Sequence, residues 1–253
     1  MCHPASRNET EGKNVVMTAL IETSSDRWKR MVRSTGVVGL VTFVVLFAAL
    51  IASSPGEPTF LASPQEALAF YLNTTAGWVQ AAMAVLDLAA IGWIWFVVGL
   101  CLLLGRAEGS PPWRSAVALV CGVILAALLL LNTSGNAASF GATDLDLAVA
   151  SYAFDVSSLG LANVWLAMGG FAVCCGWVVV STRVVGRWLG WWGIASGLGL
   201  VLARFFWTSE VIWLLPYAAF WIWVIIMCIQ LVRKPGAVLK AADGRASPGG
   251  ERP

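Results

Sequence analysis

The segment GWVQAAMAVLDLAAIGWIWFVVGLCLLL, residues 77–104, is apolar almost throughout. Its one acidic or basic residue is Asp87. A helix needs about 20 mostly apolar residues to cross the roughly 30 Å hydrocarbon core of a bilayer. Residues 77–104 are therefore predicted to form a membrane-spanning helix. Five further runs have the same character, at 36–54, 115–132, 161–181, 188–204 and 210–232. The sequence thus predicts an all-α integral membrane bundle of six helices.

The composition agrees with this class. Hydrophobic residues make up 58% of the chain and charged residues 12%. Soluble domains carry about 25% charged residues, so this chain lacks the charge to cover a water-facing surface. The basic run at residues 27–30 is explained by anchoring beside a membrane, and we expect no binding to nucleic acid.

The basic residues fall on one side of the predicted topology. When the six runs alternate through a bilayer, every one of the 16 Lys and Arg residues except Arg204 lies on the side of the two termini. The positive-inside rule then predicts that both termini lie in the cytoplasm. The bundle is expected to lie in the plasma membrane. The opposite side is acidic, with Glu57, Glu66, Asp144, Asp146, Asp155 and Glu210. Cleavage near residues 52–54 is the alternative for the first run, although its leader is long for a signal peptide.

The remaining segments divide into tails and outer helices. Residues 1–35 are expected to form a cytoplasmic segment, unstructured over 1–16, and residues 233–253 a basic, unstructured tail. Ser63-Pro64-Gln65-Glu66 has the pattern of a capped helix start, which predicts a short outer helix over 64–72. A second outer helix is expected over 143–158, with carboxylates in its first turn.

Several enzyme classes are excluded by the residues available. The only histidine is His3, and no lysine lies in a predicted span. Histidine-ligated haem, a Ser–His protease and an H-E-x-x-H metalloprotease within the bundle are therefore excluded. An intramembrane aspartyl protease needs two aspartates, and only Asp87 is available. We expect no enzyme activity, no cofactor and no metal.

Asp87 is the main candidate for function. It lies about 15 Å along its helix from the outer end, near the middle of the bilayer. An ionised carboxylate at this depth costs about 2.5–3.5 kcal/mol, so it should face the bundle interior or be protonated. In one interpretation Asp87, Gln80 and Asn163 line a polar cavity that takes up a proton or cation. In the other, Asp87 is a structural tether between helices.

Two further features concern the last two spans. Arg204 is expected to pair with Glu210 across the short outer turn, with reach to Asp87 or Asp155 as the alternative. Gly193 and Gly197 have the G-x-x-x-G spacing that lets two helices approach closely. We expect this contact inside the bundle, and a homo-oligomer through Gly193 and Gly197 is the alternative.

Three stretches resemble a bacterial family of uncharacterised six-helix membrane proteins. They are residues 62–71 (ASPQEALAFY), residues 104–109 (LGRAEG) and residues 186–193 (GRWLGWWG). The resemblance covers about residues 30–235 and implies a six-helix membrane fold. It brings no activity and no catalytic residue. The Ala-, Gly-, Val- and Trp-rich composition suggests an actinobacterium.

The sequence therefore favours a non-enzymatic, multi-pass protein with a binding or structural role in the plasma membrane. Its expected partners are the lipid bilayer and a small apolar ligand or lipid at the outer face. A small-solute or proton/cation-coupled transporter that uses Asp87 is the alternative. A second alternative is an enzyme that acts on lipid head groups at the acidic outer face, where Asp144, Asp146 and Asp155 would gather a divalent cation.

Overall fold

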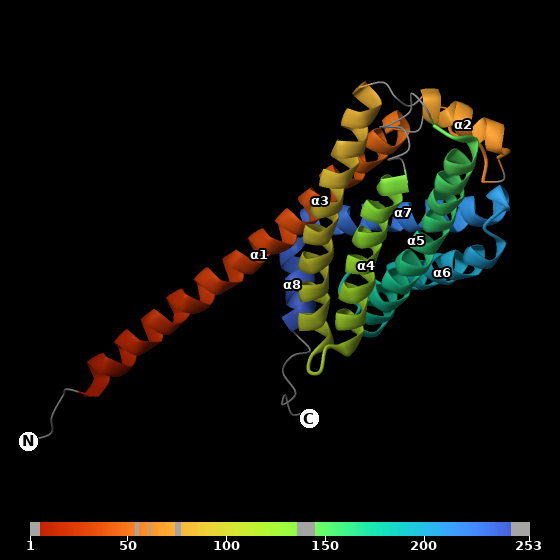
Figure 1. The fold of residues 1–253 in the computed structure, drawn as a ribbon. Coiled ribbons are helices and arrows are strands. Elements are labelled where there is room, and N and C mark those ends of the chain that lie inside the picture. Colours follow the sequence, from red (N-terminus) through yellow and green to blue (C-terminus); the bar gives the residue numbers. More distant parts are fainter. Residues whose placement is uncertain (1–5, 54–55, 61, 74–76, 136–144, 244–253) are drawn as a thin grey trace, which may run out of the picture.

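Eight α-helices and one short 3-10 helix form the described part of the chain, which confirms the all-α class (Figure 1). The computed structural model describes residues 6–53, 56–60, 62–73, 77–135 and 145–243, without the side chains of 6–24, 132–135 and 210. The helices are α1 Ser6–Ser53, α2 Pro64–Asn73, α3 Gly77–Glu108, α4 Trp113–Gly135, α5 Leu147–Thr182, α6 Arg187–Ala203, η2 Arg204–Phe206, α7 Glu210–Arg233 and α8 Pro235–Asp243.

Six of these helices are long and apolar enough to cross a membrane, as the sequence predicts. The segments are Ser25–Ser53, Gly77–Glu108, Trp113–Leu131, Leu147–Thr182, Arg187–Phe206 and Val211–Arg233. Each predicted run matches one of them, and no run extends more than one residue past its segment. The first and fourth begin more than ten residues before the predicted bounds, and the second ends four residues after them, because the neighbouring residues continue the same helices.

Three predictions about the flanking segments are wrong. The outer helix expected over 143–158 is not separate, because α5 runs from Leu147 without interruption into the fourth span. Its 36 residues give a length of about 54 Å, well above the thickness of a bilayer core. The tail after Val232 was expected to be unstructured, yet Pro235–Asp243 forms α8. The structure thus has two short helices, as expected, but only α2 lies at the predicted outer side. Residues 6–16, expected to be unstructured, belong to α1.

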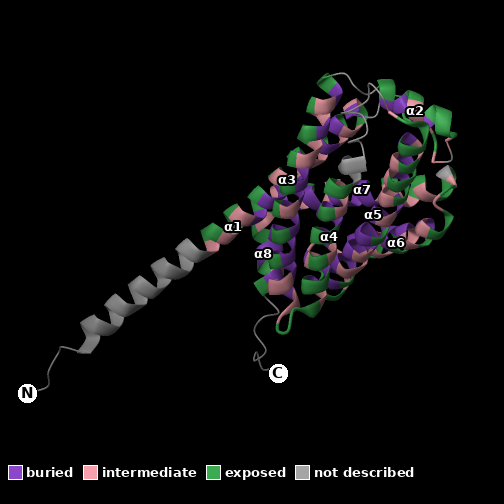
Figure 2. Cartoon of the chain, in the orientation of Figure 1, coloured by how far each residue is buried: buried purple, intermediate pink, exposed green. Residues whose placement is uncertain are grey.

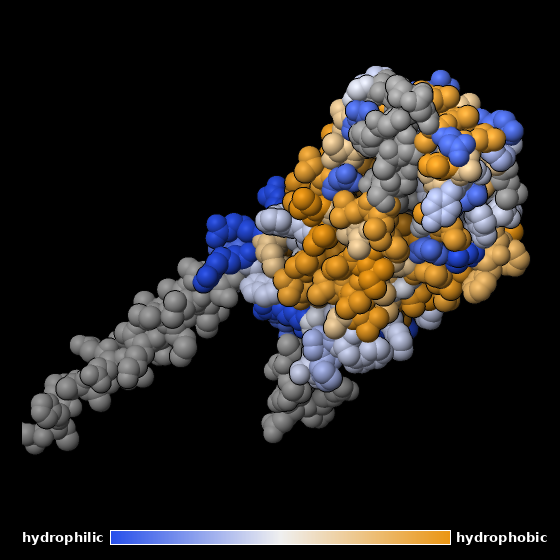
Figure 3. Space-filling model, viewed as in Figure 1, coloured by the Kyte–Doolittle hydropathy of each residue, from blue (hydrophilic) through white to orange (hydrophobic). Residues whose placement is uncertain are grey.

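The spanning helices pack as a ring of neighbours, which the contact between α6 and α7 helps to close. α5 contacts both α4 and α6, α1 contacts both α3 and α7, and α3 contacts α4 (Figure 1). Buried residues lie on the sides of the helices that face one another, and exposed residues point outward (Figure 2). The outward sides carry a broad apolar surface, with hydrophilic residues gathered toward its margins (Figure 3). This surface is the part of the molecule suited to contact lipid tails.

The two ends of the bundle differ in charge. One end holds the start of α4, the ends of α3 and α5, and α8, and we call it the basic end; Arg106, Arg114, Arg183, Arg187, Arg233 and Lys240 belong to it. The other holds α2, the start of α5 and η2, and we call it the acidic end; Glu57, Glu66, Asp146, Asp155 and Arg204 belong to it. The alternation of charge expected from the sequence therefore matches the arrangement of the helices.

Aromatic side chains fill the core. The largest fully buried side chains include Trp93, Trp165, Trp223, Phe96, Phe171 and Phe220. The indole N–H of Trp93 donates to the carbonyl of Gly122 on α4 at 3.1 Å, and that of Trp223 donates to Leu189 on α6 at 2.9 Å. These bonds give polar groups partners where no water is available. Trp95 differs from these residues, because its side chain is 64% exposed on α3.

Glycines let α5 and α6 approach closely along two turns. A Cβ placed on Gly176 would lie 2.6 Å from the carbonyl oxygen of Gly190, and one on Gly197 would lie 2.7 Å from that of Gly169. Each helix places its two glycines seven residues apart, so the pairs meet in antiparallel register. Gly193 faces the carbonyl of Ala172 and the indole of Trp223. The close approach is therefore inside the bundle, as expected, and Gly193 and Gly197 are not available to join two copies of the chain.

Candidate functional site

Two of the four candidate residues meet at the acidic end. Arg204, in η2, donates from Nε to Oδ1 of Asn163 on α5 at 3.0 Å, and both side chains are half-buried. Asn163 lies 19 residues from the end of α5 at Thr182, which corresponds to about 28 Å along the axis. This distance is close to the roughly 30 Å thickness of the hydrocarbon core. The Asn163–Arg204 bond is therefore placed where the far boundary of a bilayer would lie.

The described partner of Arg204 is thus a neutral amide on the neighbouring span. The side chain of Glu210, the expected ion-pair partner, lies outside the described residues. The hydrogen bond joins the turn after α6 to α5, so Arg204 has a positioning role that the sequence did not assign. Placing the guanidinium in this bond also fixes the start of the turn into α7.

Asp87 and Gln80 lie on one side of α3. They are seven residues apart, and both are half-buried between the packed and the outward sides of the helix. Asp87, Gln80, Asn163 and Arg204 line none of the three apolar grooves between α6 and α7, α1 and α3, and α3 and α4. A role for Asp87 in ion uptake stays a prediction.

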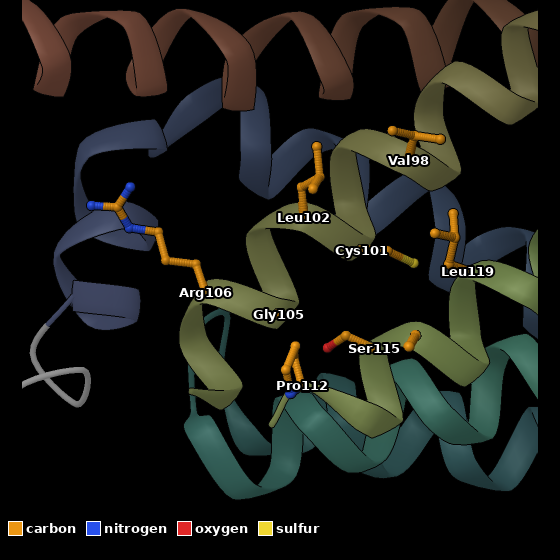
Figure 4. Close-up of a pocket in the computed structure, with 9 residues that line it drawn as sticks. Val98, Cys101, Leu102, Gly105, Arg106, Pro112, Ser115 and Leu119 are labelled. Atoms are coloured by element: carbon orange, nitrogen blue, oxygen red, sulfur yellow. The ribbon is translucent and has the colours of Figure 1, made fainter. Parts of the chain in front are cut away.

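Three apolar grooves open on the outward surface of the bundle. The largest lies between α6 and α7, has a volume of about 540 Å³ and is lined by residues that include Ala195, Gly199, Leu202, Leu215 and Pro216. The second lies between α1 and α3 and has a volume of about 360 Å³. The third lies between α3 and α4 and has a volume of about 350 Å³ (Figure 4). All three fall within the range of about 300–1,000 Å³ that small-molecule sites occupy.

The α6/α7 groove has a rigid floor in the half of the bundle near the acidic end. Gly199 faces the ring of Pro216, so that an added Cβ would lie 2.8 Å from Pro216 Cβ. Trp192 donates from Nε1 to the carbonyl of Ala219 at 3.0 Å. Leu202 and Leu215 form exposed rims. The two helices are thus held together beneath the groove while its walls stay open toward lipid.

The acidic end is covered by α2. Ser63 and Glu66 form the predicted capping box: Ser63 N donates to Glu66 Oε2 at 2.7 Å, and Glu66 N donates to Ser63 Oγ at 3.4 Å. The bonds that the Glu66 carboxylate accepts from the backbone N–H and then from the hydroxyl of Ser63 hold the pKa of Glu66 below its ordinary value. Phe70 and Tyr71 then pack on Ala150 and Phe154 of α5. Burial, followed by the nearby charges of Glu57 and Asp155, raises the pKa of Tyr71 to about 12.

An aromatic cluster lies beneath this cover. Trp165 and Trp213 stack with ring centroids 5.2 Å apart and an angle of 20°. Phe60, from the segment between α1 and α2, contacts both rings edge-on. The segment that leads into α2 is thereby fixed to α5 and α7, which gives the cover two independent attachments.

At the basic end, Glu108 joins the end of α3 to Arg114 and Ser115 at the start of α4, a clasp that was not predicted from the sequence. Glu108, whose side chain is 3% exposed, accepts bonds from Arg114 Nε at 2.8 Å and from Ser115 Oγ at 2.7 Å. It also accepts from the backbone N–H groups of Arg114 and Ser115 at 3.1 and 2.9 Å, and so caps the start of α4. Arg114 continues to Ser181 on α5 at 3.1 Å. The sequence feature that indicates this clasp is Glu108, an acidic residue between Arg106 and Arg114 that is followed after a short turn by Arg114 and Ser115.

The described residues contain no group of three or more His, Cys, Asp or Glu side chains placed to hold a metal ion. Asp144, part of the cation site considered from the sequence, lies outside the described residues. Comparison with known protein families, curated proteins and solved structures finds no match to this chain. The resemblance seen in the sequence therefore identifies no family. The chain is a multi-pass membrane protein.

Proposed function

We propose that this protein is a non-enzymatic binding protein of the plasma membrane, and that it holds a lipid chain or a similar small apolar ligand in the α6/α7 groove. The proposed orientation places the basic end in the cytoplasm and the acidic end outside, as the positive-inside rule favours. The groove then opens into the outer leaflet. Its ligand would enter sideways from the bilayer.

The observation that carries this proposal is the shape of the groove. It is lined almost wholly by apolar side chains, its floor is fixed by the Gly199–Pro216 contact, and its rims, Leu202 and Leu215, are exposed. Without a hydrophobic driving force between solutes in lipid, binding depends on close packing against preformed surfaces. A groove whose shape does not depend on the ligand supplies such a surface at low entropic cost.

A matched pair of variants tests the proposal. Ala195 lines the groove from α6 and is exposed, whereas Ala218 is exposed on α7 and does not line it. In detergent micelles, Ala195→Phe should abolish saturable binding of a spin-labelled fatty acid, because its ring fills the groove. Ala218→Phe should bind like the unmodified protein. Equal binding by both variants, or no saturable binding by the unmodified protein, contradicts the proposal.

A transporter that uses Asp87 is the second candidate. It is supported by the half-buried position of this carboxylate within a span, with Gln80 two turns away on the same side. Ionisable residues inside membranes are rare and often line ion pathways. Proton uptake by reconstituted vesicles should be abolished by Asp87→Asn. Uptake that is unchanged in Asp87→Asn would remove this candidate.

A further inference from the structure

We infer that the basic end carries a separate site for one anionic phospholipid with two acyl chains, one in the α1/α3 groove and the other in the α3/α4 groove. This site is distinct from the α6/α7 groove and does not depend on the function proposed above. The two grooves share residues, match in size and end beside the same arginine.

The two grooves lie on either side of one ridge of α3. Val98 and Leu102 line both of them. The α1/α3 groove continues to Met31 and Thr35 of α1, and the α3/α4 groove continues to Ser115 and Leu119 of α4. Figure 4 shows Val98 and Leu102 on successive turns of α3, above the space that Pro112, Ser115 and Leu119 face. The ridge therefore divides one apolar surface into two parallel channels.

The channels suit the two chains of one lipid. Their volumes are nearly equal, about 360 and 350 Å³. The α1/α3 groove follows α3 from Ile91 to Leu102, which is about 16 Å along the axis. A single leaflet of the hydrocarbon core is about 15 Å thick, half of the whole. The α1/α3 channel thus takes about one leaflet depth of acyl chain, in the leaflet on the side of the basic end. The α3/α4 channel follows α3 from Val98 to Arg106, which is about 12 Å of the same depth.

An arginine continues the ridge at the boundary of that leaflet. Arg106 follows Leu102 by four residues, so it lies on the same side of α3, and it also lines the α3/α4 groove. Its guanidinium stacks on Trp28 of α1 at 4.4 Å and forms an ion pair with Asp243 of α8. Trp28 is one turn before Met31, which lines the other groove. The α3/α4 channel therefore ends at Arg106, and the α1/α3 channel ends one helical turn from both Arg106 and Trp28.

The charge at this end fits an anionic head group. Arg106 keeps about a third of its side chain exposed despite its two contacts. Arg30 and Arg33 are exposed on α1 nearby, and Lys240 is exposed on α8. Each basic residue near the surface of a membrane adds about 1 kcal/mol of attraction for anionic lipid. A phosphodiester beside Arg106 would share the guanidinium with Asp243 and would be held above the two chains.

The test is to count the lipids that the full-length protein retains in detergent, by native mass spectrometry. The probes are phosphatidylglycerol, phosphatidylcholine with the same chains, and single-chain lysophosphatidylglycerol. We expect one phosphatidylglycerol to be retained, about fivefold over phosphatidylcholine. Lysophosphatidylglycerol should be retained less, because it fills one channel. Equal retention of the three lipids would show unspecific surface lipid and overturn the inference.

Variants locate the site. Ala116 lines the α3/α4 groove and is exposed, so Ala116→Leu should lose the second chain and with it the preference for two-chain lipid. Ala84→Leu, at an exposed position of α3 outside the three grooves, is the control. Arg106→Gln should reduce the preference for phosphatidylglycerol about fivefold, and Arg187→Gln, at the same end but beside neither groove, should not. Unchanged retention in both Ala116→Leu and Arg106→Gln would place the lipid elsewhere. Loss of fatty-acid binding in Ala195→Phe leaves these results unaffected.

Discussion

Replacing Gly176 by alanine should weaken the contact between α5 and α6. The added Cβ would lie 2.6 Å from the carbonyl oxygen of Gly190 and 2.9 Å from the backbone nitrogen of Ile194. Both neighbours are helix backbone, so the strain is relieved only if the two helices move apart by several tenths of an ångström. Overpacking of this kind costs about 1–3 kcal/mol.

Gly105→Ala is the matched control. Its Cβ would meet Pro112 Cβ at 3.5 Å, which is an ordinary contact. Both substitutions gain the same helix propensity, about 1 kcal/mol, so the difference between them isolates the overpacking. The free energy of unfolding, measured by tryptophan fluorescence during titration with a denaturing detergent, should be about 1–3 kcal/mol lower for Gly176→Ala than for Gly105→Ala.

A double substitution sharpens this test. Gly190→Ala acts on the same contact from the other helix, because its Cβ would lie 2.8 Å from the carbonyl oxygen of Gly176. Once one alanine has separated the helices, the second should cost less, so the loss in the double variant should be smaller than the sum. The packing argument is refuted if Gly176→Ala is as stable as Gly105→Ala.

Two further predictions concern the ends of the bundle. Glu108→Ala should lower the free energy of unfolding by about 3–5 kcal/mol, because it leaves Arg114 without its carboxylate partner in a mostly buried clasp. In the same detergent titration, Asp26→Ala, which removes only the exposed ion pair with Lys29, should cost about 0–1 kcal/mol. Similar losses in the two variants would contradict the role of the clasp. The raised pKa of Tyr71 means that its neutral phenol stabilises the packing of α2 on α5 fully below pH 10.0, and that this contribution is lost as pH rises toward about 12. Limited proteolysis of α2 should therefore accelerate over this pH range in the unmodified protein and not in Tyr71→Phe, and equal acceleration in both would refute the assignment.

The parts of the fold that follow from local rules could be predicted. The six spans follow from apolar length, and α2 follows from its capping box because Ser63 and Glu66 are three residues apart. The α5/α6 glycine register was within reach, since both helices carry glycines seven residues apart. The helix α8 was not predicted, because its stability comes from contacts with residues far away in the sequence. Val238, Leu239 and Ala242 are buried, and Asp243 pairs with Arg106.

The candidate site was harder to predict for a physical reason. A polar residue in an apolar span is visible in the sequence, which is how Asp87 and Asn163 were found. A groove depends on which small side chains of two helices come to lie opposite each other. Ala195 and Gly199 on α6 produce the α6/α7 groove only because Pro216 and Ala219 of α7 face them. Residues that would mark a groove are the commonest residues of any membrane helix, so the sequence gives no sign of it.

The proposed orientation of the six spanning helices places the basic end in the cytoplasm and the acidic end outside. Cysteine labelling tests it most directly, in a variant whose own cysteines are replaced. Gly77, at the acidic end, and Gly236, at the basic end, both have open space where a side chain would be added. In intact cells a membrane-impermeant maleimide should label Gly77→Cys, and it should label Gly236→Cys only after the membrane is permeabilised. Labelling of Gly236→Cys in intact cells, or equal labelling of both positions from one side, would contradict the account.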